Sequence, residues 1–162
     1  MKIIKLGGKT DEVMFVDNED FERVNKYKWR LNQVIHSKYG LGRIEDKKTG
    51  KKRSVMAHRF VLNLEDKLTI DHIDRNGLNN QKSNLRIATP SENQHNRGLN
   101  KNNTSGYKGV TFNKMAKKWQ SQIRYEYKTL YLGCFENQKE AAVEYDKKAK
   151  ELFGEFALLN FK

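Results

Sequence analysis

A dense group of polar side chains begins at residue 71 and contains residue types that hydrolytic chemistry uses. Asp71 and His72 are adjacent, and an Asn-rich stretch follows them and ends at Asn84 and Leu85. Imidazole can accept a proton near neutral pH, and carboxylate and amide oxygens are hard donors that suit Mg²⁺ or Mn²⁺. An Asp-His pair taken alone is usually a turn or a surface feature, so the surrounding pattern has to decide its role.

A short capped helix is expected directly after this stretch. Thr89 suits the N-cap, Pro90 suits the first helical position, and Glu92 completes a capping box. Asn93 and Arg97 are four residues apart, so we expect them to share one face of that helix.

The complete pattern resembles the HNH homing endonucleases of phages and introns, over about residues 55–98. The shared features are the Asp-His pair, the Asn-rich loop, the Asn-Leu pair and a capped helix that carries Asn. The resemblance implies a ββα-metal centre, in which a β-hairpin packs on a helix around one divalent cation. It also implies hydrolysis of the phosphodiester bonds of DNA, which needs an activated water, a cation and support for the leaving oxygen.

The same resemblance implies a role for each polar side chain. Asp71 and Asn93 would bind the metal, and His72 would be the general base. Asn84 would tie the loop together and fix the direction of His72. Arg97 would hold the scissile phosphate.

Other polar residues of the segment receive plainer interpretations. Asn76, Asn79 and Asn80 are interpreted as turn formers, because Asn tolerates left-handed backbone. For His58 we favour a buried helix residue over a phosphate contact. The metal ligands implied here are Asp and Asn, where many HNH proteins have His, which leaves the preferred metal open.

Composition points to a polyanionic partner. The 162 residues include 32 Lys and Arg against 20 Asp and Glu, a formal net charge of +12. Cys134 is the only cysteine, which excludes an internal disulfide and a Cys-rich zinc site. No apolar run approaches the roughly 20 residues that span a bilayer, so we expect a soluble intracellular protein.

The C-terminal part alternates like a small sheet and then becomes an amphipathic helix. Strands are expected at 107–112, 119–125 and 129–135. Trp119 and Ile123 should face the core, while Gln122 and Arg124 should lie on the other face. A capping box that starts at Asn137 should begin the helix.

This module resembles an AP2 domain over about residues 104–160. In that family a three-stranded sheet lies in the major groove of DNA and the helix supports it from behind. Seven basic residues and one acidic residue between positions 100 and 135 agree with a sheet that faces phosphate. The resemblance implies groove-facing side chains at Lys108, Thr111, Asn113, Gln122, Arg124, Thr129 and Tyr131.

The expected fold class is α+β, with a ββα-metal HNH nuclease core and an AP2-like three-stranded antiparallel sheet with one helix. The expected domains are an N-terminal strand and helix region at 1–54, the HNH core at 55–98, a linker at 99–105 and the AP2-like domain at 106–162. Within the first region we expect strands at 3–6 and 13–16, a helix capped by Asp17 or Asn18, and an exposed basic hairpin tip at 47–52.

These observations together predict a metal-dependent, site-directed DNA endonuclease of the homing type, targeted by the AP2-like sheet. Mg²⁺ or Mn²⁺ is the expected cofactor and double-stranded DNA the expected partner. We expect a monomer in the cytoplasm of a bacterial host, if a phage or an intron encodes it.

Two alternatives remain. One is a non-catalytic AP2-type DNA-binding regulator, against which the set Asp71, His72 and Asn93 argues. The other is an RNA-directed or non-specific nuclease, against which the groove-reading sheet argues.

Overall fold

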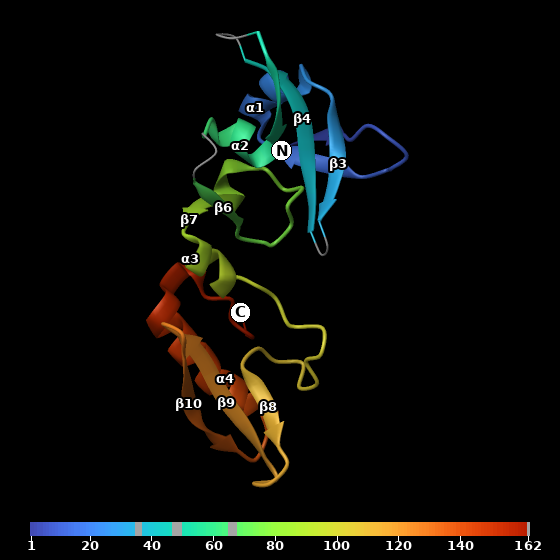
Figure 1. The fold of residues 1–162 in the computed structure, drawn as a ribbon. Helices are drawn as coiled ribbons and strands as arrows, with labels where there is room; N and C mark the ends of the chain where they lie inside the picture. Colours follow the sequence, from blue (N-terminus) through green and yellow to red (C-terminus); the bar gives the residue numbers. More distant parts are fainter. Residues whose placement is uncertain (35–36, 47–49, 65–67, 162) are drawn as a thin grey trace. The chain divides into compact units, whose positions relative to one another are not determined.

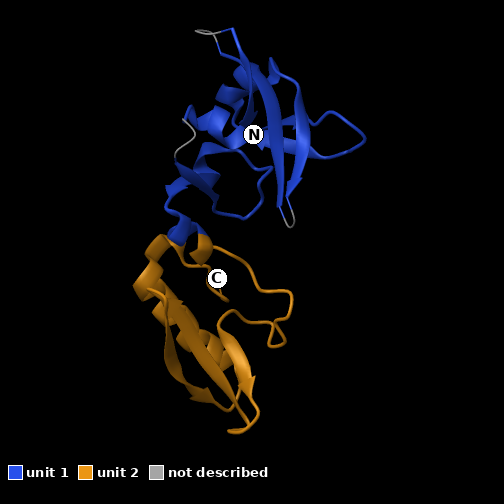
Figure 2. Cartoon of the chain, viewed as in Figure 1, with its two compact units in different colours: residues 1–93 blue, residues 94–162 orange. Residues whose placement is uncertain are grey.

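The computed structural model describes residues 1–34, 37–46, 50–64 and 68–161, which form two compact units, Met1–Asn93 and Gln94–Lys162 (Figure 2). Unit 1 contains β1 (Lys2–Lys5), β2 (Val13–Val16), α1 (Asn18–Asn25), β3 (Trp29–Val34), β4 (Ser37–Glu45), β5 (Lys52–Met56), α2 (Ala57–Leu62), β6 (Thr69–His72), a 3₁₀ turn (Lys82–Asn84) and β7 (Leu85–Ala88). The helix α3 (Pro90–His95) spans the boundary (Figure 1). Unit 2 contains β8 (Val110–Asn113), β9 (Lys118–Tyr125), β10 (Lys128–Phe135), α4 (Gln138–Phe153) and a 3₁₀ turn (Gly154–Phe156).

Unit 1 has one hydrophobic core, to which both halves of the unit contribute. The strands pair antiparallel as β1-β2, β3-β4-β5 and β6-β7. The core combines Ile4, Leu6, Met14, Val16, Val24, Trp29 and Ile44 with Ala57, Val61, Ile70, Leu78 and Leu85. The structure therefore places the residues expected as an N-terminal region, 1–54, in the same unit as the nuclease segment that follows.

The expected N-terminal elements are confirmed, with one difference at the helix start. The strands at 3–6 and 13–16 correspond to β1 and β2, and the helix is α1. Asp17 occupies the N-cap position, but its side chain makes no capping hydrogen bond. It accepts instead from Lys82 N at 2.8 Å and from Gln81 Nε2 at 3.2 Å. The Asp17 carboxylate therefore binds a loop that is distant in the sequence.

The strands β4 and β5 pair antiparallel on either side of the basic tip expected at 47–52. Residues 47–49 of that tip lie outside the described residues. None of the helices in the described part of the chain is long and apolar enough to cross a membrane.

Unit 2 is a three-stranded antiparallel sheet of order β10-β9-β8 with α4 packed on one face. Ile123 of β9 packs with Tyr145 and Ala149 of α4, as the amphipathic pattern predicts. Asn137 caps α4 through its side chain, which accepts from Glu140 N at 2.9 Å, so the capping box is confirmed.

The expected strand at 107–112 is wrong in its first part, because β8 begins at Val110. The residues before β8 form a tight turn. In this turn Ser105 Oγ donates to the carbonyl oxygens of Tyr107 and Val110 at 3.0 and 2.8 Å. Gly109 has a φ of +76°, and a Cβ there would lie 1.9 Å from Tyr145 Cδ2. The chain therefore approaches α4 too closely at this point for an ordinary strand residue.

The boundary between the units lies upstream of the expected linker at 99–105. The ring of His95 stacks on Phe153, with 3.7 Å between the centroids and 9° between the planes. Lys108 Nζ donates to the carbonyl oxygens of His95 and Arg97, at 2.5 and 2.9 Å. These contacts attach residues 94–98 to unit 2.

Candidate active site

Two short strands and one helix form the frame of the site in the order β6, β7, α3. The antiparallel register places Asp71 opposite Arg86 and His72 opposite Leu85. Arg86 Nε and Nη2 donate to Asp71 Oδ2 at 2.9 and 2.6 Å, and both side chains are largely buried. His72 follows Asp71 directly, and the Asp71 carboxylate is close enough to raise its pKa.

His72 ends β6 and is 6% exposed. Burial lowers the pKa of His72 from its ordinary value of 6.5. The side chain of Asn80, which can accept a hydrogen bond from the protonated ring, and the carboxylates of Asp74 and Asp71 oppose this shift without cancelling it. The ring is therefore uncharged at neutral pH and able to accept a proton.

The loop between β6 and β7 is organised around Asp74 and Asn84. Asn84 Nδ2 donates to Asp74 Oδ1 at 2.9 Å and to Asn79 O at 2.8 Å, and Asp74 N donates to Asn84 Oδ1 at 3.0 Å. Asp74 also accepts from Asn76 N and from Asn79 Nδ2. Burial raises the pKa of Asp74, but these hydrogen bonds outweigh it and hold the pKa below its ordinary value. Asn84 thus has the contacts that a residue tying the loop together needs.

The strand β2 holds residues 78–80 of the same loop through backbone hydrogen bonds. Phe15 N donates to Leu78 O, and Asn80 N donates to Phe15 O, each at 2.8 Å. The Asp17 carboxylate accepts from Lys82 N a little further along. The N-terminal hairpin therefore holds the loop at the position where Asn80 meets His72.

The capping box of α3 is confirmed, because Glu92 N donates to Thr89 Oγ1 and Thr89 N donates to Glu92 Oε2. Asn93 lies on this helix with an exposed side chain. The expectation that Arg97 shares a helix face with Asn93 is wrong, because α3 ends at His95. Arg97 N donates to Gln94 O in the turn that follows.

Comparisons with known proteins agree with this frame. A family model described as HNH endonuclease matches residues 55–95. A protein of Acanthamoeba polyphaga mimivirus described as an uncharacterized HNH endonuclease is 34% identical over 162 residues, covering 96% of this chain and 78% of its own length. The chain belongs to the HNH endonuclease family.

A second relative of this HNH protein is Protein 3.8 of Escherichia phage T7. It is 39% identical over 88 residues, which cover 54% of this chain and 72% of the phage protein. No solved structure matches the chain.

The donor groups proposed for a metal suit a hard divalent cation. Asp71 offers a carboxylate and Asn93 an amide oxygen, and Mg²⁺ commonly takes one or two protein oxygens while keeping water and substrate phosphate as its other ligands. Among the described residues no group of three or more His, Cys, Asp or Glu could hold a metal ion. Arg86 already donates to Asp71, so a cation would share that carboxylate with the guanidinium.

Sequence reasoning missed two residues of this HNH centre. Asn80 was interpreted as a turn former, but it is fully buried beside His72. The sequence pattern gives Arg86 no role, although it pairs with Asp71. Alternation along β6 and β7 could have indicated Arg86 as a neighbour of Asp71, whereas Asn80 depends on how the loop folds back and has no local signal.

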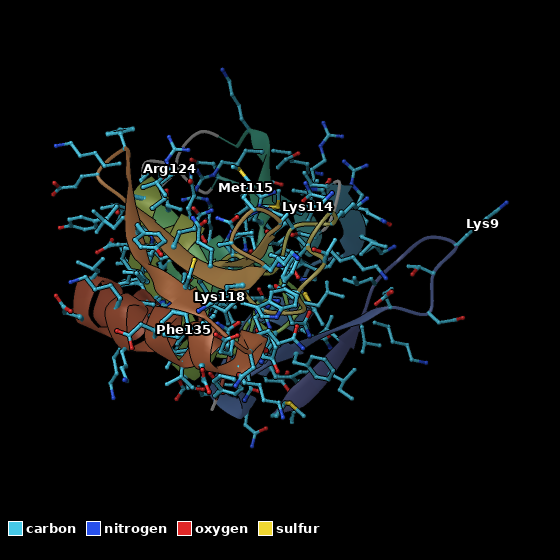
Figure 3. All side chains as sticks on the ribbon, turned by 90° about the horizontal axis from the view of Figure 1, so that it is seen from below. Lys9, Lys114, Met115, Lys118, Arg124 and Phe135 are labelled. Carbon is cyan, nitrogen blue, oxygen red and sulfur yellow. The ribbon has the colours of Figure 1, made fainter. Side chains whose placement is uncertain are left out.

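In unit 2, most of the residues expected to face DNA lie on the sheet face opposite α4. Gln122 pairs with Tyr131, and Arg124 pairs with Thr129, across β9 and β10. Thr111 lies on the same face of β8, opposite Gln120. Arg124, Thr129, Tyr131 and Thr111 are exposed, and Figure 3 shows Arg124 among the projecting side chains.

Lys108 and Asn113 differ from the other five, because internal contacts occupy them. The Lys108 ammonium donates to two backbone carbonyls of unit 2, as described above. Asn113 Oδ1 accepts from Met115 N and Ala116 N, both at 3.0 Å, and so closes the turn between β8 and β9. Both contacts favour a structural part for these two side chains.

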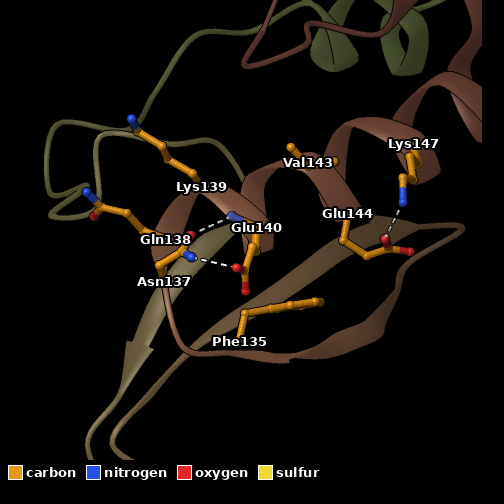
Figure 4. A pocket seen from close by; sticks show the side chains of 8 residues that line it. All are labelled: Phe135, Asn137, Gln138, Lys139, Glu140, Val143, Glu144 and Lys147. Carbon is orange, nitrogen blue, oxygen red and sulfur yellow. Dashed lines mark hydrogen bonds and ion pairs between the residues drawn. The ribbon is translucent and has the colours of Figure 1, made fainter.

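A surface pocket in unit 2 lies beside the start of α4 (Figure 4). Its lining is Phe135, Asn137, Gln138, Lys139, Glu140, Val143, Glu144 and Lys147. Four of its polar side chains pair with one another, since Asn137 and Glu140 form the capping box and Lys147 pairs with Glu144. These pairs stabilise α4.

Proposed function

We propose that this HNH protein is a metal-dependent, site-directed endonuclease of homing type that hydrolyses double-stranded DNA. The observation that carries the proposal is the buried His72 at the end of β6, next in sequence to Asp71 and beside the buried side chain of Asn80. A base that is oriented by a second side chain and stands next to an oxygen donor is what phosphodiester hydrolysis requires.

In this proposal His72 takes the proton from the attacking water. Asn80 orients the ring, and Asn84 holds the loop that carries Asn80. Asp71 and Asn93 would hold the cation, which when bound would supply positive charge against the phosphate and the leaving oxygen. Arg97 lies beyond α3, where its guanidinium would contact a phosphate of the bound DNA.

Cleavage of supercoiled plasmid tests the nuclease proposal. The full chain should cut with Mg²⁺ and stop in EDTA, and His72→Ala should lower the rate by roughly 100-fold or more while leaving DNA affinity nearly unchanged. Lys147→Ala, on α4, is the matched control and should cut like wild type. Binding without any cutting by the wild type would instead support the non-catalytic regulator.

We further propose that the exposed sheet face of unit 2 finds the target site, in the manner of an AP2 domain. Gln and Arg side chains can form paired hydrogen bonds with the base edges of adenine and guanine, respectively, and Gln122 and Arg124 are neighbours on this face. The opposite side of the unit is acidic, with six acidic residues against four lysines between positions 136 and 156. Phosphate should therefore approach the sheet and avoid α4.

Fluorescence anisotropy with the full chain and its target DNA tests the targeting proposal. Arg124→Ala should cost about 1–3 kcal/mol on the preferred site and much less on random DNA. Lys147→Ala should leave both affinities unchanged. Equal effects of Arg124→Ala on both DNAs would remove base reading from the sheet.

A further inference from the structure

Three aromatic rings meet at the HNH centre, and two of them have no role in the mechanism above. The His58 ring lies edge-on to His72, with 5.1 Å between centroids and 84° between planes. The Tyr39 ring lies 5.7 Å from His58 and 5.9 Å from His72. The three rings thus contact one another as a closed set, and edge-to-face packing of this kind is a favoured arrangement of aromatic rings.

We propose that His58 is a positioning residue for DNA cleavage, which with Tyr39 fixes the plane of the His72 ring. The inference rests on the proposed function, in which His72 is the general base. His58 would not touch the DNA or the water, and would act only through His72.

The backbone of the loop is adapted to this ring set. Gly77 packs against Tyr39, and a Cβ on Gly77 would lie 2.5 Å from both Cδ1 and Cε1 of that ring. The glycine therefore leaves the space that the Tyr39 ring fills. Tyr39 is held between the loop on one side and the two histidines on the other.

The state of His58 favours packing over chemistry. Burial lowers the pKa of His58 to about 3, with the neighbouring His72 and Arg59 contributing in the same direction. Its buried Nδ1 atom has no hydrogen-bond partner among the described residues. An uncharged His58 ring with no hydrogen bond at Nδ1 can position His72 by packing against it. It carries no positive charge that would attract a phosphate.

Two substitutions separate the ring from its nitrogens. His58→Phe keeps a planar ring and should leave kcat within about threefold of wild type. His58→Leu fills the space without a ring and should lower kcat about 10- to 100-fold, because small misplacements of a catalytic group are costly. The KM for DNA should be unchanged in both variants, since His58 does not contact DNA.

Each failure of the test has a distinct meaning. Equal damage in His58→Phe and His58→Leu would show that a ring nitrogen is needed, as for a phosphate contact, and would overturn the inference. Wild-type kcat in His58→Leu would also overturn it. His72→Ala is assayed alongside these variants. If it cleaves DNA at the wild-type rate, the proposed function itself is wrong.

Tyr39 provides a second test if thermal unfolding shows that the His58→Leu variant is not folded. Tyr39→Phe keeps the ring and should cut like wild type. Tyr39→Leu should lower kcat with KM unchanged. Wild-type kcat in Tyr39→Leu would show that the ring set does not position His72.

Discussion

The burial of His58 makes unit 1 sensitive to acid, and His58→Phe should remove much of that sensitivity. The pKa of His58 is 6.5 in an unfolded chain and about 3 in the folded protein. The folded value is the lower one, so below pH 6.5 the unfolded state binds more protons and stability falls as the pH falls. This loss continues until the pH approaches 3.

The expected magnitude follows from the width of that window. Each pH unit well inside it costs about 1.4 kcal/mol for one group. Between pH 7 and pH 5 the contribution of His58 is therefore about 2 kcal/mol, which corresponds to roughly 10 °C in Tm for a unit of this size. The lowered pKa of His72 acts in the same direction and remains in the variant, so the wild type should lose more than this in total.

Tryptophan fluorescence can follow unit 1 alone, because Trp29 is buried there and Trp119 lies in unit 2. In a Trp119→Phe background, urea unfolding at pH 7 and pH 5 gives the free energy of unfolding of unit 1. The loss between these pH values should be about 2 kcal/mol smaller in His58→Phe than in the parent.

Val61→Ala is the control, because it removes buried apolar volume from the same helix and adds no titrating group. Its free energy of unfolding should be lower by the same amount at both pH values. Equal losses in His58→Phe and the parent would refute the claim that His58 is buried in its uncharged form.

Two further predictions concern the loop of the HNH centre. Asn80→Ala should lower kcat and move the acidic limb of the pH–rate profile to lower pH, because the side chain that raises the pKa of His72 is lost; an unshifted limb in plasmid cleavage would argue against this contact. Gly77→Ala should displace Tyr39 and lower both kcat and Tm, whereas Gly7→Ala, where a Cβ meets Trp29 O at 3.4 Å, should be mild. Equal Tm values for the two glycine variants would contradict the close approach.

Local signals predicted much of the fold. The capping boxes Thr89–Glu92 and Asn137–Glu140 depend on residues three apart, and both form as expected. Alternation correctly placed Ile123 in the core, opposite the exposed Arg124. These features are readable because a helix turn or a strand pleat fixes them within a few residues.

The errors came where a side chain serves a distant part of the chain. Asp17 has the sequence position of an N-cap, yet its carboxylate accepts from Lys82 N, 65 residues away. Asn80 resembles any turn asparagine, yet it is buried against His72. The strand expected from residue 107 does not begin there, because Ser105 and Gly109 form a turn packed against α4. No short-range sequence pattern indicates that packing.

The position of the family match explains why the distant contacts matter for catalysis. Residues 55–95 match the HNH endonuclease model, and a segment of about that length seldom buries enough apolar surface to fold alone. The segment contains no cysteine, so no disulfide can stabilise it. The strands β1 to β4 and α1 supply the missing core, through side chains such as Met14 and Trp29.

The same N-terminal strands also set the geometry of the base. Phe15 on β2 bonds the loop on both sides of Asn79, and Tyr39 on β4 packs against His72. The orientation of His72 is therefore a property of unit 1 as a whole. Substitutions in residues 1–54 that disturb β2 or β4 should therefore lower the rate of DNA cleavage by shifting this loop. No residue of that region belongs to the HNH motif.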